Sequence, residues 1–352
     1  MPARLAASNV ISRRTILLTG AGGSIGSALA KAILRLGPRQ LILLDHSERN
    51  LNQIDWELAA GADGNLFTSV LGDISDASLL SELFQRYRPE VVYHAAAFKH
   101  VPLMESNPIA VVRNNALGTA MLAKICRERG AAILVMVSTD KAVNPISIMG
   151  ASKRFAELAL LRWNHSGTRM SAVRLGNVLA SQGSVVPRFL KQISRGGPVT
   201  VTHPGAARYF FTIDEAVDLI LLASALAEDG GIFVPRLGPP VKILDMALQL
   251  IADAAAKTGK AVPVVFAGLR PGDKLSEEFL SGDEFAEPTT DPRLFRVNTE
   301  RLLAGGFDSR LAELSRSVAQ RDLPAMMETL CAMVPDYRPT EVLRRARESS
   351  SV

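Results

Sequence analysis

The sequence has few cysteines and no long apolar run. Its two cysteines, Cys126 and Cys331, are too few for a disulfide framework and lack metal-ligand spacing, so we expect a reduced, cytoplasmic protein with no resident metal. The longest apolar runs, such as LILLASALA at residues 219–227, fall far short of the roughly 20 residues that span a bilayer. The N-terminus also lacks the apolar core of a signal peptide. These absences predict a soluble chain with no membrane span.

A strong charge bias is also missing. The 40 basic and 35 acidic residues leave a net charge of +5, and the basic residues are interspersed with acids rather than clustered. A nucleic-acid partner is therefore not expected, and a phosphorylated small substrate explains the modest excess equally well. The two ends, residues 1–12 and 339–352, are predicted to be mobile, with docking of a partner by the basic tail as the alternative.

Apolar strands alternate regularly with helices over the first half of the chain. At 352 residues and 47% hydrophobic, the chain is long enough to bury a large core. We expect strands at residues 15–19, 41–44, 67–71, 91–94, 132–137 and 171–175, with helices at 24–36, 48–60, 76–87, a stretch ending near 129, and 149–164. Because the strands are apolar throughout, they predict a parallel sheet covered on both faces, which is a doubly wound α/β Rossmann fold.

Glycine and proline break this rhythm after residue 178. We expect a cofactor-binding Rossmann domain over residues 13–178, completed by about 205–238. The interrupted segments at 179–204 and 239–338 suit a smaller substrate-binding lobe.

A glycine-rich turn marks the predicted cofactor site. Gly20, Gly23 and Gly26 follow the first strand and open the first helix, where backbone amides can bind a pyrophosphate. Asp45 ends the second strand 19 residues after Gly26, at the position where a carboxylate accepts both ribose hydroxyls of NAD. The same carboxylate would repel the extra phosphate of NADP. We therefore predict NAD, although Arg49 one helical turn later keeps NADP open.

The third and fourth strands end in further candidate cofactor contacts. Asp73 and Ile74 are placed to meet the adenine, although a helix cap explains Asp73 equally well. Small residues after the fourth strand would let the backbone approach the cofactor. The expected cofactor set is completed by Ser24, Ile25, Ala95, Ala96, Ala97, Asn115 and Lys153.

Asp140 and Lys141 are the obvious acid/base pair. They follow a predicted strand, at the end where ligands collect in open α/β sheets. Lysine acts as a base only when its pKa falls toward neutrality, which burial beside Lys153 would favour. A protonated Asp140 would need the opposite shift. The alternative is a surface turn with a local ion pair.

Several longer motifs support a family resemblance. They are HAAAFKHVPLMESNP (94–108), NNALGT (114–119), STDKAVNP (138–145), MGASKR (149–154), RLGNV (174–178), GSVVPRF (183–189) and LRPGDKLSEE (269–278). With the glycines, the chain resembles the CapD-type polysaccharide biosynthesis proteins, UDP-N-acetylglucosamine 4,6-dehydratases of the extended short-chain dehydrogenase/reductase superfamily. The resemblance covers roughly residues 14–282 and implies a nucleotide-sugar lyase that oxidises C4, eliminates water across C5 and C6, and returns the hydride to C6.

Met149 occupies the position where the active-site helix of this superfamily normally carries a proton-transferring tyrosine. A thioether has no ionisable proton, so other residues must supply the acid/base chemistry. The membrane-linked branch of the family is similar in using methionine here, so the resemblance implies a subgroup trait.

The resemblance assigns roles to the neighbouring side chains. It implies that Lys141 is the base at C5, that Asp140 is the acid at the C6 oxygen, and that Thr139 binds the C4 oxygen. Lys153 would hold the nicotinamide ribose, and Met149 would pack against the sugar or the nicotinamide. The acceptor of the C4 hydroxyl proton is left open between Asp140 and a water.

The resemblance also implies a UDP-sugar substrate and a homo-oligomer. The expected substrate contacts are Lys99, His100, Asn177, Val186, Arg208, Arg270 and Lys274. The two arginines and the second lysine would supply donors for the diphosphate. Inversion at C5 stays open. The alternative functions are a UDP-sugar 4-epimerase, which needs no acid at C6, and a non-catalytic NAD-binding regulator.

Overall fold

A nine-stranded sheet forms the centre of the structure, a computed structural model that describes residues 3–61, 66–164, 167–179, 181, 183–226, 230–298 and 306–348. The strand order is β14-β15-β11-β6-β5-β4-β1-β2-β3. The parallel strands are β1 (Thr15–Thr19), β2 (Gln40–Asp45), β3 (Phe67–Leu71), β4 (Val91–His94), β5 (Ile133–Thr139), β6 (Arg169–Leu175) and β11 (Gly231–Pro235). Antiparallel β15 (Leu294–Val297) and β14 (Ala286–Pro288) complete one edge.

Burial explains why the central strands are apolar along their whole length. In β1 the register pairs Leu17 with Ile42 on one side and with Val92 on the other, and all three side chains are buried. A strand that is covered on both faces needs no polar alternation. The doubly wound Rossmann fold predicted from the sequence is confirmed.

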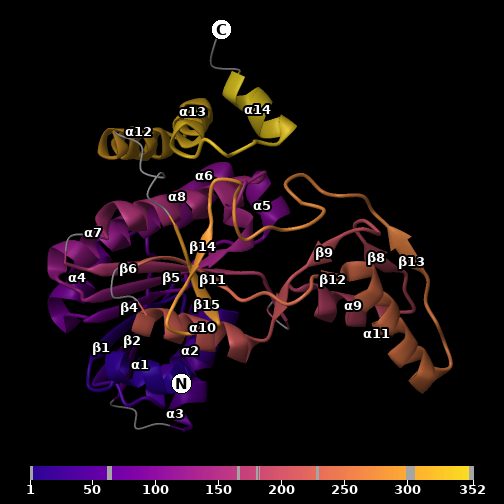
Figure 1. Ribbon diagram of the computed structural model, residues 1–352, viewed down its shortest axis with the longest axis horizontal. Coiled ribbons are helices and arrows are strands. Elements are labelled where there is room, and N and C mark those ends of the chain that lie inside the picture. The colour runs from indigo at the N-terminus through magenta and orange to yellow at the C-terminus, as the bar shows by residue number, and fades with distance from the viewer. Residues whose placement is uncertain are drawn as a thin grey trace.

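Helices cover both faces of the sheet (Figure 1). One face carries α1 (Ala3–Ile11), α2 (Ser24–Leu34), α3 (Glu48–Ala59) and α10 (Ile213–Leu226). The other carries α4 (Ala77–Tyr87), α7 (Thr119–Arg129) and α8 (Ile148–Trp163), with short α5 (Val101–Glu105) and α6 (Pro108–Val111) beside them. A π-helical turn, η1 (Val112–Gly118), joins α6 to α7.

Local side-chain caps fix where several helices begin. Ser47 caps α3 by accepting from the amide of Asn50, and Asp76 caps α4 by accepting from two amides. Ser147 does the same for α8 through the amide of Gly150. At the far end, left-handed Gly130 terminates α7. The N-terminal caps satisfy amide groups that the helix itself leaves unpaired, and the Gly130 amide donates to carbonyls of the last turn of α7.

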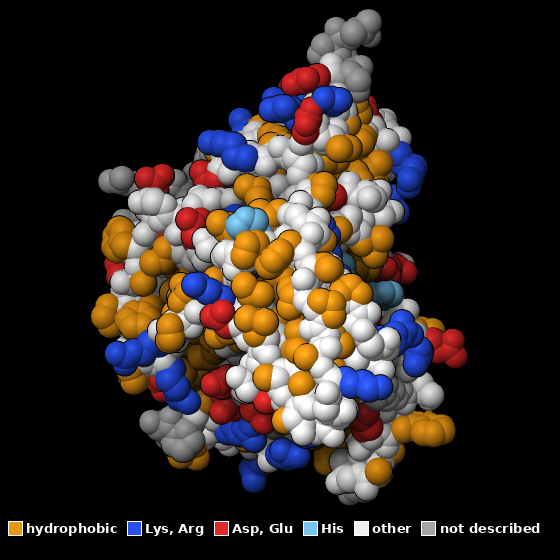
Figure 2. All heavy atoms as spheres, turned by 90° about the vertical axis from the view of Figure 1, so that its right-hand side faces the viewer, with side chains coloured by type: hydrophobic (Ala, Val, Ile, Leu, Met, Phe, Trp, Pro, Cys, Tyr) orange, Lys and Arg blue, Asp and Glu red, His pale blue; other side chains and the backbone are white. Residues whose placement is uncertain are grey.

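A smaller lobe projects from the carboxyl edge of the sheet (Figure 1). It contains α9 (Val185–Ser194), β8 (Val199–Val201), β9 (Ala207–Arg208), β12 (Val241–Lys242), α11 (Ile243–Thr258) and β13 (Val264–Phe266). Buried Phe189, Val199 and Ile243 belong to its separate apolar core. The pair β7 (Asn177–Val178) and β10 (Phe210–Phe211) lies where the chain passes between sheet and lobe. The outer face shows apolar side chains near its centre with basic and acidic groups interspersed around them (Figure 2).

The prediction that residues 1–12 form a mobile lead is wrong for the described part. Residues 3–11 form α1, whose Ala3, Ala7 and Ile11 are buried against the rest of the fold. The Arg4 guanidinium donates to Asp218 of α10 at 2.9 Å. These apolar residues recur every four positions, which places them on one helix face. The small size of the two alanines concealed the pattern.

Two further expectations about the C-terminal third need correction. The sequence places residues 239–338 in the lobe, yet β14 and β15 extend the main sheet and α12 (Phe307–Gln320) and α13 (Leu323–Met333) pack beside α8. It also predicts a mobile tail at 339–352, yet α14 (Glu341–Glu348) forms and buries Leu343. Apolar residues that pack on neighbouring elements stabilise both segments. Residues 349–352 lie outside the described part.

No helix within the described ranges is both long enough and apolar enough to cross a bilayer.

Candidate functional site

The glycine-rich turn between β1 and α2 forms a cradle with no room for side chains. A Cβ on Gly26 would lie 2.0 Å from the carbonyl oxygen of Gly20, and a Cβ on Gly20 would lie 2.5 Å from the amide nitrogen of Ala96. Gly20 also has a φ of +68°, which favours glycine. Gly23 starts α2 with no side-chain cap. The cradle therefore brings backbone close to any group held at the first turn of α2, as a pyrophosphate site requires.

Asp45 stands at the end of β2 beside this cradle. Its carboxylate accepts from the amides of Gly22 at 2.9 Å and Ser47 at 2.8 Å, which fixes its orientation. Asp73, by contrast, accepts from the amide of Ser75 at 2.7 Å, while Asp76 rather than Asp73 caps α4. The structure thus assigns Asp73 to a turn.

One cavity of about 700 Å³ runs from the cradle to the lobe. Most of the predicted site residues line it: Gly20, Gly23, Ser24, Ile25, Gly26, Asp45, Ile74, Ala95, Ala96, Ala97, Lys99, His100, Thr139, Lys141, Met149, Lys153, Asn177, Val186, Arg208 and Arg270. Four predicted residues do not line it: Asp73, Asn115, Asp140 and Lys274. Residues from the first motif, at Gly20, to the last motif, at Arg270, therefore line the same cavity.

Asn115 does not line the cavity but hydrogen-bonds the backbone of Phe98, which does. From η1 it accepts from the amide of Phe98 at 2.8 Å and donates to the carbonyl of Phe98 at 2.9 Å. It also donates to Ser152 of α8 at 3.2 Å. Asn115 therefore holds the segment after β4 in place, and the π-helical turn points its side chain at that segment.

A buried polar chain that sequence reasoning missed lies beneath the cavity. His94 Nδ1 lies 2.7 Å from the Thr19 hydroxyl, and His94 Nε2 lies 2.8 Å from the Thr119 hydroxyl, which itself donates to the carbonyl of Asn115. Because a hydroxyl has one proton, Thr119 must accept from Nε2, and Thr19 donates to Nδ1. Burial and nearby Lys153 lower the pKa of His94 to about 3, so the ring is neutral.

Lys153 is buried one turn after Met149 on α8. Burial lowers the pKa of Lys153 to about 8, while the charge of Glu157 partly opposes that effect. The ammonium thus loses part of its charge just above neutral pH. Met149 itself is 2% exposed and contributes an apolar surface to the cavity wall.

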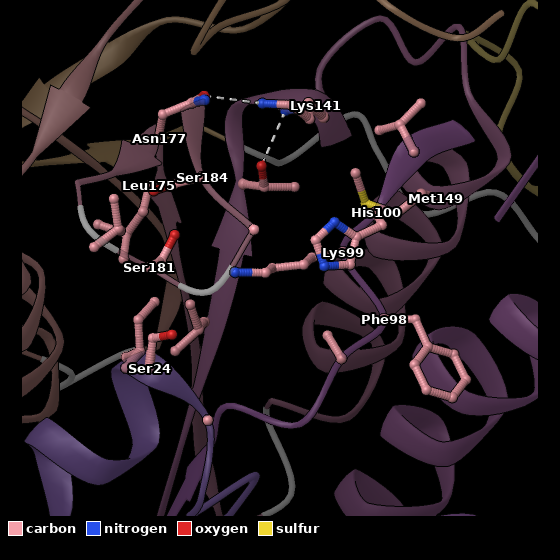
Figure 3. A pocket seen from close by; sticks show the side chains of 18 of the residues that line it. Ser24, Phe98, Lys99, His100, Lys141, Met149, Leu175, Asn177, Ser181 and Ser184 are labelled. Carbon is pink, nitrogen blue, oxygen red and sulfur yellow. Dashed lines mark hydrogen bonds between the residues drawn. The ribbon is translucent and has the colours of Figure 1, made fainter. Parts of the chain in front are cut away.

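The Thr139, Asp140 and Lys141 triplet begins where β5 ends and forms the short helix η2 (Asp140–Ala142). The Asp140 side chain is fully buried, and its Oδ1 accepts from the Thr139 hydroxyl and from Lys141 Nζ, both at 2.9 Å. Asp140 Oδ2 is buried with no hydrogen-bond partner among the described residues. Lys141 also donates to the Asn177 side chain at 3.4 Å, as Figure 3 shows.

The expectation of a lowered Lys141 pKa is wrong for this structure. Burial does oppose the charged form, but the carboxylates of Asp140 and Glu277 outweigh it and raise the pKa of Lys141. Glu277 Oε1 lies 3.5 Å from Lys141 Nζ. The surface-turn alternative also fails, because both carboxylates are almost completely buried.

Two side chains after β4 face the cavity from the opposite wall. Lys99 extends into the open space in Figure 3, and His100 lies near Met149. Burial lowers the pKa of Lys99, and burial together with the Lys99 charge lowers the pKa of His100. Burial therefore disfavours the charged form of both side chains.

The predicted diphosphate donors fall into two groups. Arg270 lines the cavity and pairs with Asp273 at 2.8 Å, with its side chain 49% exposed. The structure corrects the prediction for Lys274, whose ammonium donates to the carbonyl of Val143 at 2.8 Å outside the cavity. Arg208 lines the cavity, yet its terminal nitrogens donate to the backbone carbonyls of its own lobe and the RPGDK segment.

Two other charged residues of the site were not predicted. Arg188 on α9 lines the cavity and comes from the GSVVPRF motif, in which only Val186 was predicted as a substrate contact. Glu277 lies directly behind Lys141 and comes from the LRPGDKLSEE motif. Both residues belong to motifs that support the family resemblance, and this membership could have identified them as candidates. The sequence spacing within the motifs did not show which charged side chain would contact the Thr139, Asp140 and Lys141 triplet.

A buried ion network ties the triplet's strand to the RPGDK region. Arg174 on β6 donates to Glu157 of α8 at 2.9 Å and to Glu284 of the loop between β13 and β14 at 2.7 Å. Arg154 bridges the same two carboxylates, and Ser138, the residue before Thr139, donates to Glu157 at 2.7 Å. Every charge in this network has a partner, so it fixes the relative position of β5 and the segment that carries Glu277.

Comparison with known proteins identifies a family that the chain matches. The model for the family described as polysaccharide biosynthesis protein matches residues 16–299. The capsular polysaccharide biosynthesis protein CapD of Staphylococcus aureus is 42% identical over 319 residues, which cover 90% of this chain and 53% of CapD. The chain therefore spans about half the length of the first curated relatives it matches.

Shorter relatives include two different enzymes. A UDP-N-acetylglucosamine 4,6-dehydratase (inverting) of Campylobacter jejuni and a UDP-glucose 4-epimerase of Rickettsia rickettsii are each 32% identical, covering 78% of this chain and 80% of the relative. Among solved structures, Pen from Bacillus thuringiensis has a TM-score of 0.73 at 27% identity, covering 81% of this chain and 89% of Pen. The Thermus thermophilus UDP-glucose 4-epimerase in complex with NAD has a TM-score of 0.62 at 25% identity, covering 75% of this chain and 89% of the epimerase.

Proposed function

The chain belongs to the polysaccharide biosynthesis protein family, and from that premise we propose that it is a nucleotide-sugar 4,6-dehydratase acting on a UDP-N-acetylhexosamine of the UDP-N-acetylglucosamine type. The observation that carries this proposal is the ion pair of buried Asp140 with Lys141 at the end of β5, since Lys141 lines the cavity together with Met149. Elimination of water needs both an acid and a base, and this pair supplies both at one place.

We infer that the cofactor is NAD, and the glycine cradle fits it. The first turn of α2 would hold the pyrophosphate, and Asp45 would accept the adenosine ribose hydroxyls. Lys153 would hold the nicotinamide ribose, with Ala95, Ala96 and Ala97 allowing close approach of the backbone. When bound, NAD supplies a hydride acceptor that is regenerated within each turnover. Asp45 favours NAD over NADP because its negative charge would repel the additional phosphate.

Proton balance assigns Asp140 a double role. The reaction removes the C4 hydroxyl proton and must add one proton to the departing C6 hydroxyl, so a single group can take the first and give the second. Asp140 is ionised when it accepts the C4 proton and neutral when it donates to the C6 oxygen. Its Oδ2 has no hydrogen-bond partner among the described residues, and its Oδ1 contacts Thr139 and Lys141, which line the cavity. Thr139 would donate to the C4 oxygen, and no tyrosine is needed.

Lys141 is the proposed base at C5. Once C4 is a ketone, the C5 proton becomes acidic, and a neutral Lys141 amine can remove it and later return a solvent-exchangeable proton to the same carbon. Return to the opposite face would invert C5. Met149 would exclude water from this step by packing against the ring.

Substrate recognition would fall to the lobe and the segment after β4. Arg188 and Arg270 supply guanidinium groups that suit a diphosphate, and Val186 lines the same side of the cavity. Lys99, His100 and Asn177 line the pocket shown in Figure 3 and would contact the sugar. Arg208 would contribute only through its position, because its donors are already bound to carbonyls.

A UDP-sugar 4-epimerase is the second candidate, and the 32% identical Rickettsia epimerase favours it. Epimerisation needs no acid at the C6 oxygen. Incubation of the purified protein with UDP-N-acetylglucosamine, followed by NMR of the sugar, separates the candidates. A 4-keto-6-deoxy sugar supports dehydration, and UDP-N-acetylgalactosamine supports epimerisation. Cofactor binding without turnover would support a non-catalytic regulator.

A further inference from the structure

We propose that Glu277 is a positioning residue that stores the Lys141 proton during each turnover, which leaves Lys141 neutral and Asp140 free for the sugar protons. This inference rests on the proposed dehydratase function and deepens it. Glu277 belongs to the loop between β13 and β14, and it contacts Lys141 without lining the cavity itself.

The surroundings of Glu277 suit a carboxyl group that changes its proton. Its side chain is 2% exposed, and Oε1 lies 3.5 Å from Lys141 Nζ and 3.6 Å from Arg208 Nε. These distances permit ion pairing but exceed a good hydrogen bond. Oε2 is buried and makes no hydrogen bond within the described residues. An unpartnered buried oxygen is less unfavourable on a neutral acid than on a carboxylate.

Of the two cations that pair with Glu277 within the described ranges, only Lys141 can give up a proton. Arg208 keeps its charge at any accessible pH, and its terminal nitrogens are held by three backbone carbonyls. Lys141 is the other cation, and it pairs with the carboxylates of both Asp140 and Glu277. Lys274 donates to Val143 instead of Glu277. A proton that reaches Glu277 therefore comes from Lys141.

The transfer keeps the cluster electrically neutral. The N–H bond of the Lys141 ammonium breaks with its electron pair left on nitrogen, and an O–H bond forms on Glu277. Before transfer, Lys141 and Arg208 balance Asp140 and Glu277, and after transfer Arg208 alone balances Asp140. Loss of the same proton to solvent would leave one buried carboxylate without a counter-charge, which is strongly unfavourable.

Asp140 cannot serve as this store in the proposed reaction. It lies closer to Lys141 than Glu277 does, at 2.9 Å against 3.5 Å. However, it must be ionised to accept the C4 hydroxyl proton and must keep that proton for the C6 oxygen. Two protons would then compete for one carboxylate, so a second carboxyl group is required to free the lysine lone pair.

The test compares the pH dependence of C5 exchange in the wild type and in Glu277→Gln, which keeps the shape and removes the titrating group. Both proteins are incubated with UDP-N-acetylglucosamine in deuterated buffer, and deuterium at C5 is followed by NMR. We expect a rate that changes little across the neutral range in the wild type. In Glu277→Gln the lysine must lose its proton to solvent, so the rate should be roughly 100-fold lower at neutral pH and should rise about tenfold per pH unit.

Two further variants control for structural damage. Glu278→Gln alters the adjacent residue, which is 53% exposed and pairs with Lys274, and should keep the wild-type profile. Glu277→Asp retains a carboxylate on a shorter side chain and should be slower with the wild-type pH profile. If Glu277→Gln does not fold, Glu277→Asp still tests the inference, because a rate that rises steeply with pH in this carboxylate-bearing variant would overturn the proton store.

The outcomes separate this inference from the proposed function. A wild type that makes no 4-keto-6-deoxy sugar overturns both. A wild type that makes it, with Glu277→Gln equally active or slowed by the same factor at every pH, overturns the proton store alone. If Glu277→Asp and Glu277→Gln are both slowed by a constant factor at every pH, the proton store is also overturned. A purely structural residue changes the rate but does not change the shape of the pH profile.

Discussion

At the scale of single residues, buried charges are used in two different ways. Around Arg174, the carboxylates of Glu157 and Glu284 both pair with guanidinium groups, which holds them in their ionised form. Around Lys141 both Asp140 and Glu277 leave one oxygen without a partner among the described residues. The first cluster therefore supports the fold, and the second suits proton transfer.

The Arg174 cluster makes a prediction about stability against pH. The Arg174 guanidinium and that of Arg154 overcome the effect of burial and lower the pKa of Glu284 to about 2. A lowered folded-state pKa stabilises the fold above the unfolded value, near 4.5, and that stability is lost as the pH falls toward 2. We expect Glu284→Gln to lower the free energy of unfolding by roughly 3 kcal/mol at neutral pH.

Urea unfolding at a series of pH values checks this prediction. The difference between the wild type and Glu284→Gln should shrink between about pH 4.5 and pH 2. Glu287→Gln, at an exposed position of β14, should follow the wild type throughout. A difference that persists unchanged at pH 2 would show that the carboxylate charge is not what stabilises the cluster.

Single residues were predictable where chemistry and chain position coincide. Asp140 and Lys141 are adjacent and follow a strand, so a short stretch of sequence was enough to identify them. Glu277 lies far along the chain from Lys141, and only the fold brings the two together. The raised pKa of Lys141 was missed because the sequence prediction considered burial beside Lys153 and gave too little weight to adjacent Asp140, while the further contribution of Glu277 depends on the fold.

At the scale of elements, the carboxyl edge of the sheet collects the site. The turn after β1 supplies the glycine cradle, the segment after β4 supplies Lys99 and His100, and the segment after β5 supplies the triplet. Parallel strands end at one edge, which is why three separate motifs meet there.

The glycine cradle makes a prediction about binding. Gly26→Ala places a methyl group 2.0 Å from the carbonyl oxygen of Gly20, so the turn must shift away from its phosphate-binding shape. We expect NAD affinity to fall by about tenfold or more, measured by calorimetric titration. Gly61→Ala is the matched control, because a Cβ there meets nothing within 4 Å. Unchanged affinity in Gly26→Ala would argue against a cofactor at this turn.

Regular elements were predictable and irregular ones were not. The apolar strands from β1 to β6 follow from composition and turn residues alone. The π-helical turn η1, which aims Asn115 at Phe98, has no signature in the spacing of apolar residues. Helix α1 was missed because alanine is a weak hydrophobic signal, although two of the three residues on its buried face are alanines.

At the scale of the whole molecule, the C-terminal helices cover α8. Every residue of α8 except Arg162 is buried, since the sheet lies on one side and α12 and α13 lie on the other. Phe307 of α12 stacks on Phe155 and meets the edge of Trp163, with ring centroids 5.7 Å and 6.0 Å away. The segment beyond the motifs thus supports the helix that carries Met149 and Lys153.

This arrangement makes a prediction about global stability. Phe307→Ala should lower the free energy of unfolding by about 3 kcal/mol, because it leaves a cavity against α8. Val342→Ala changes α14 at a side chain that is 68% exposed and should alter it by no more than about 0.5 kcal/mol. Denaturant titration measures both. Equal values for the two variants would mean that α12 does not stabilise α8.

The position of the C-terminal third could not be predicted from the sequence. Residues 283–352 contain no motif, and their apolar residues indicate helices and strands without naming the surface they cover. Only the structure shows that β15 returns antiparallel to β11 and that α12 reaches α8.

The central claim is that Asp140 and Lys141 move the sugar's protons where a tyrosine is absent. Turnover of UDP-N-acetylglucosamine in deuterated water by the wild type and by Lys141→Ala, with NMR of the sugar, tests it most directly. We expect the wild type to release a 4-keto-6-deoxy sugar that carries deuterium at C5, and Lys141→Ala to incorporate none there. Undiminished incorporation in Lys141→Ala would contradict the account.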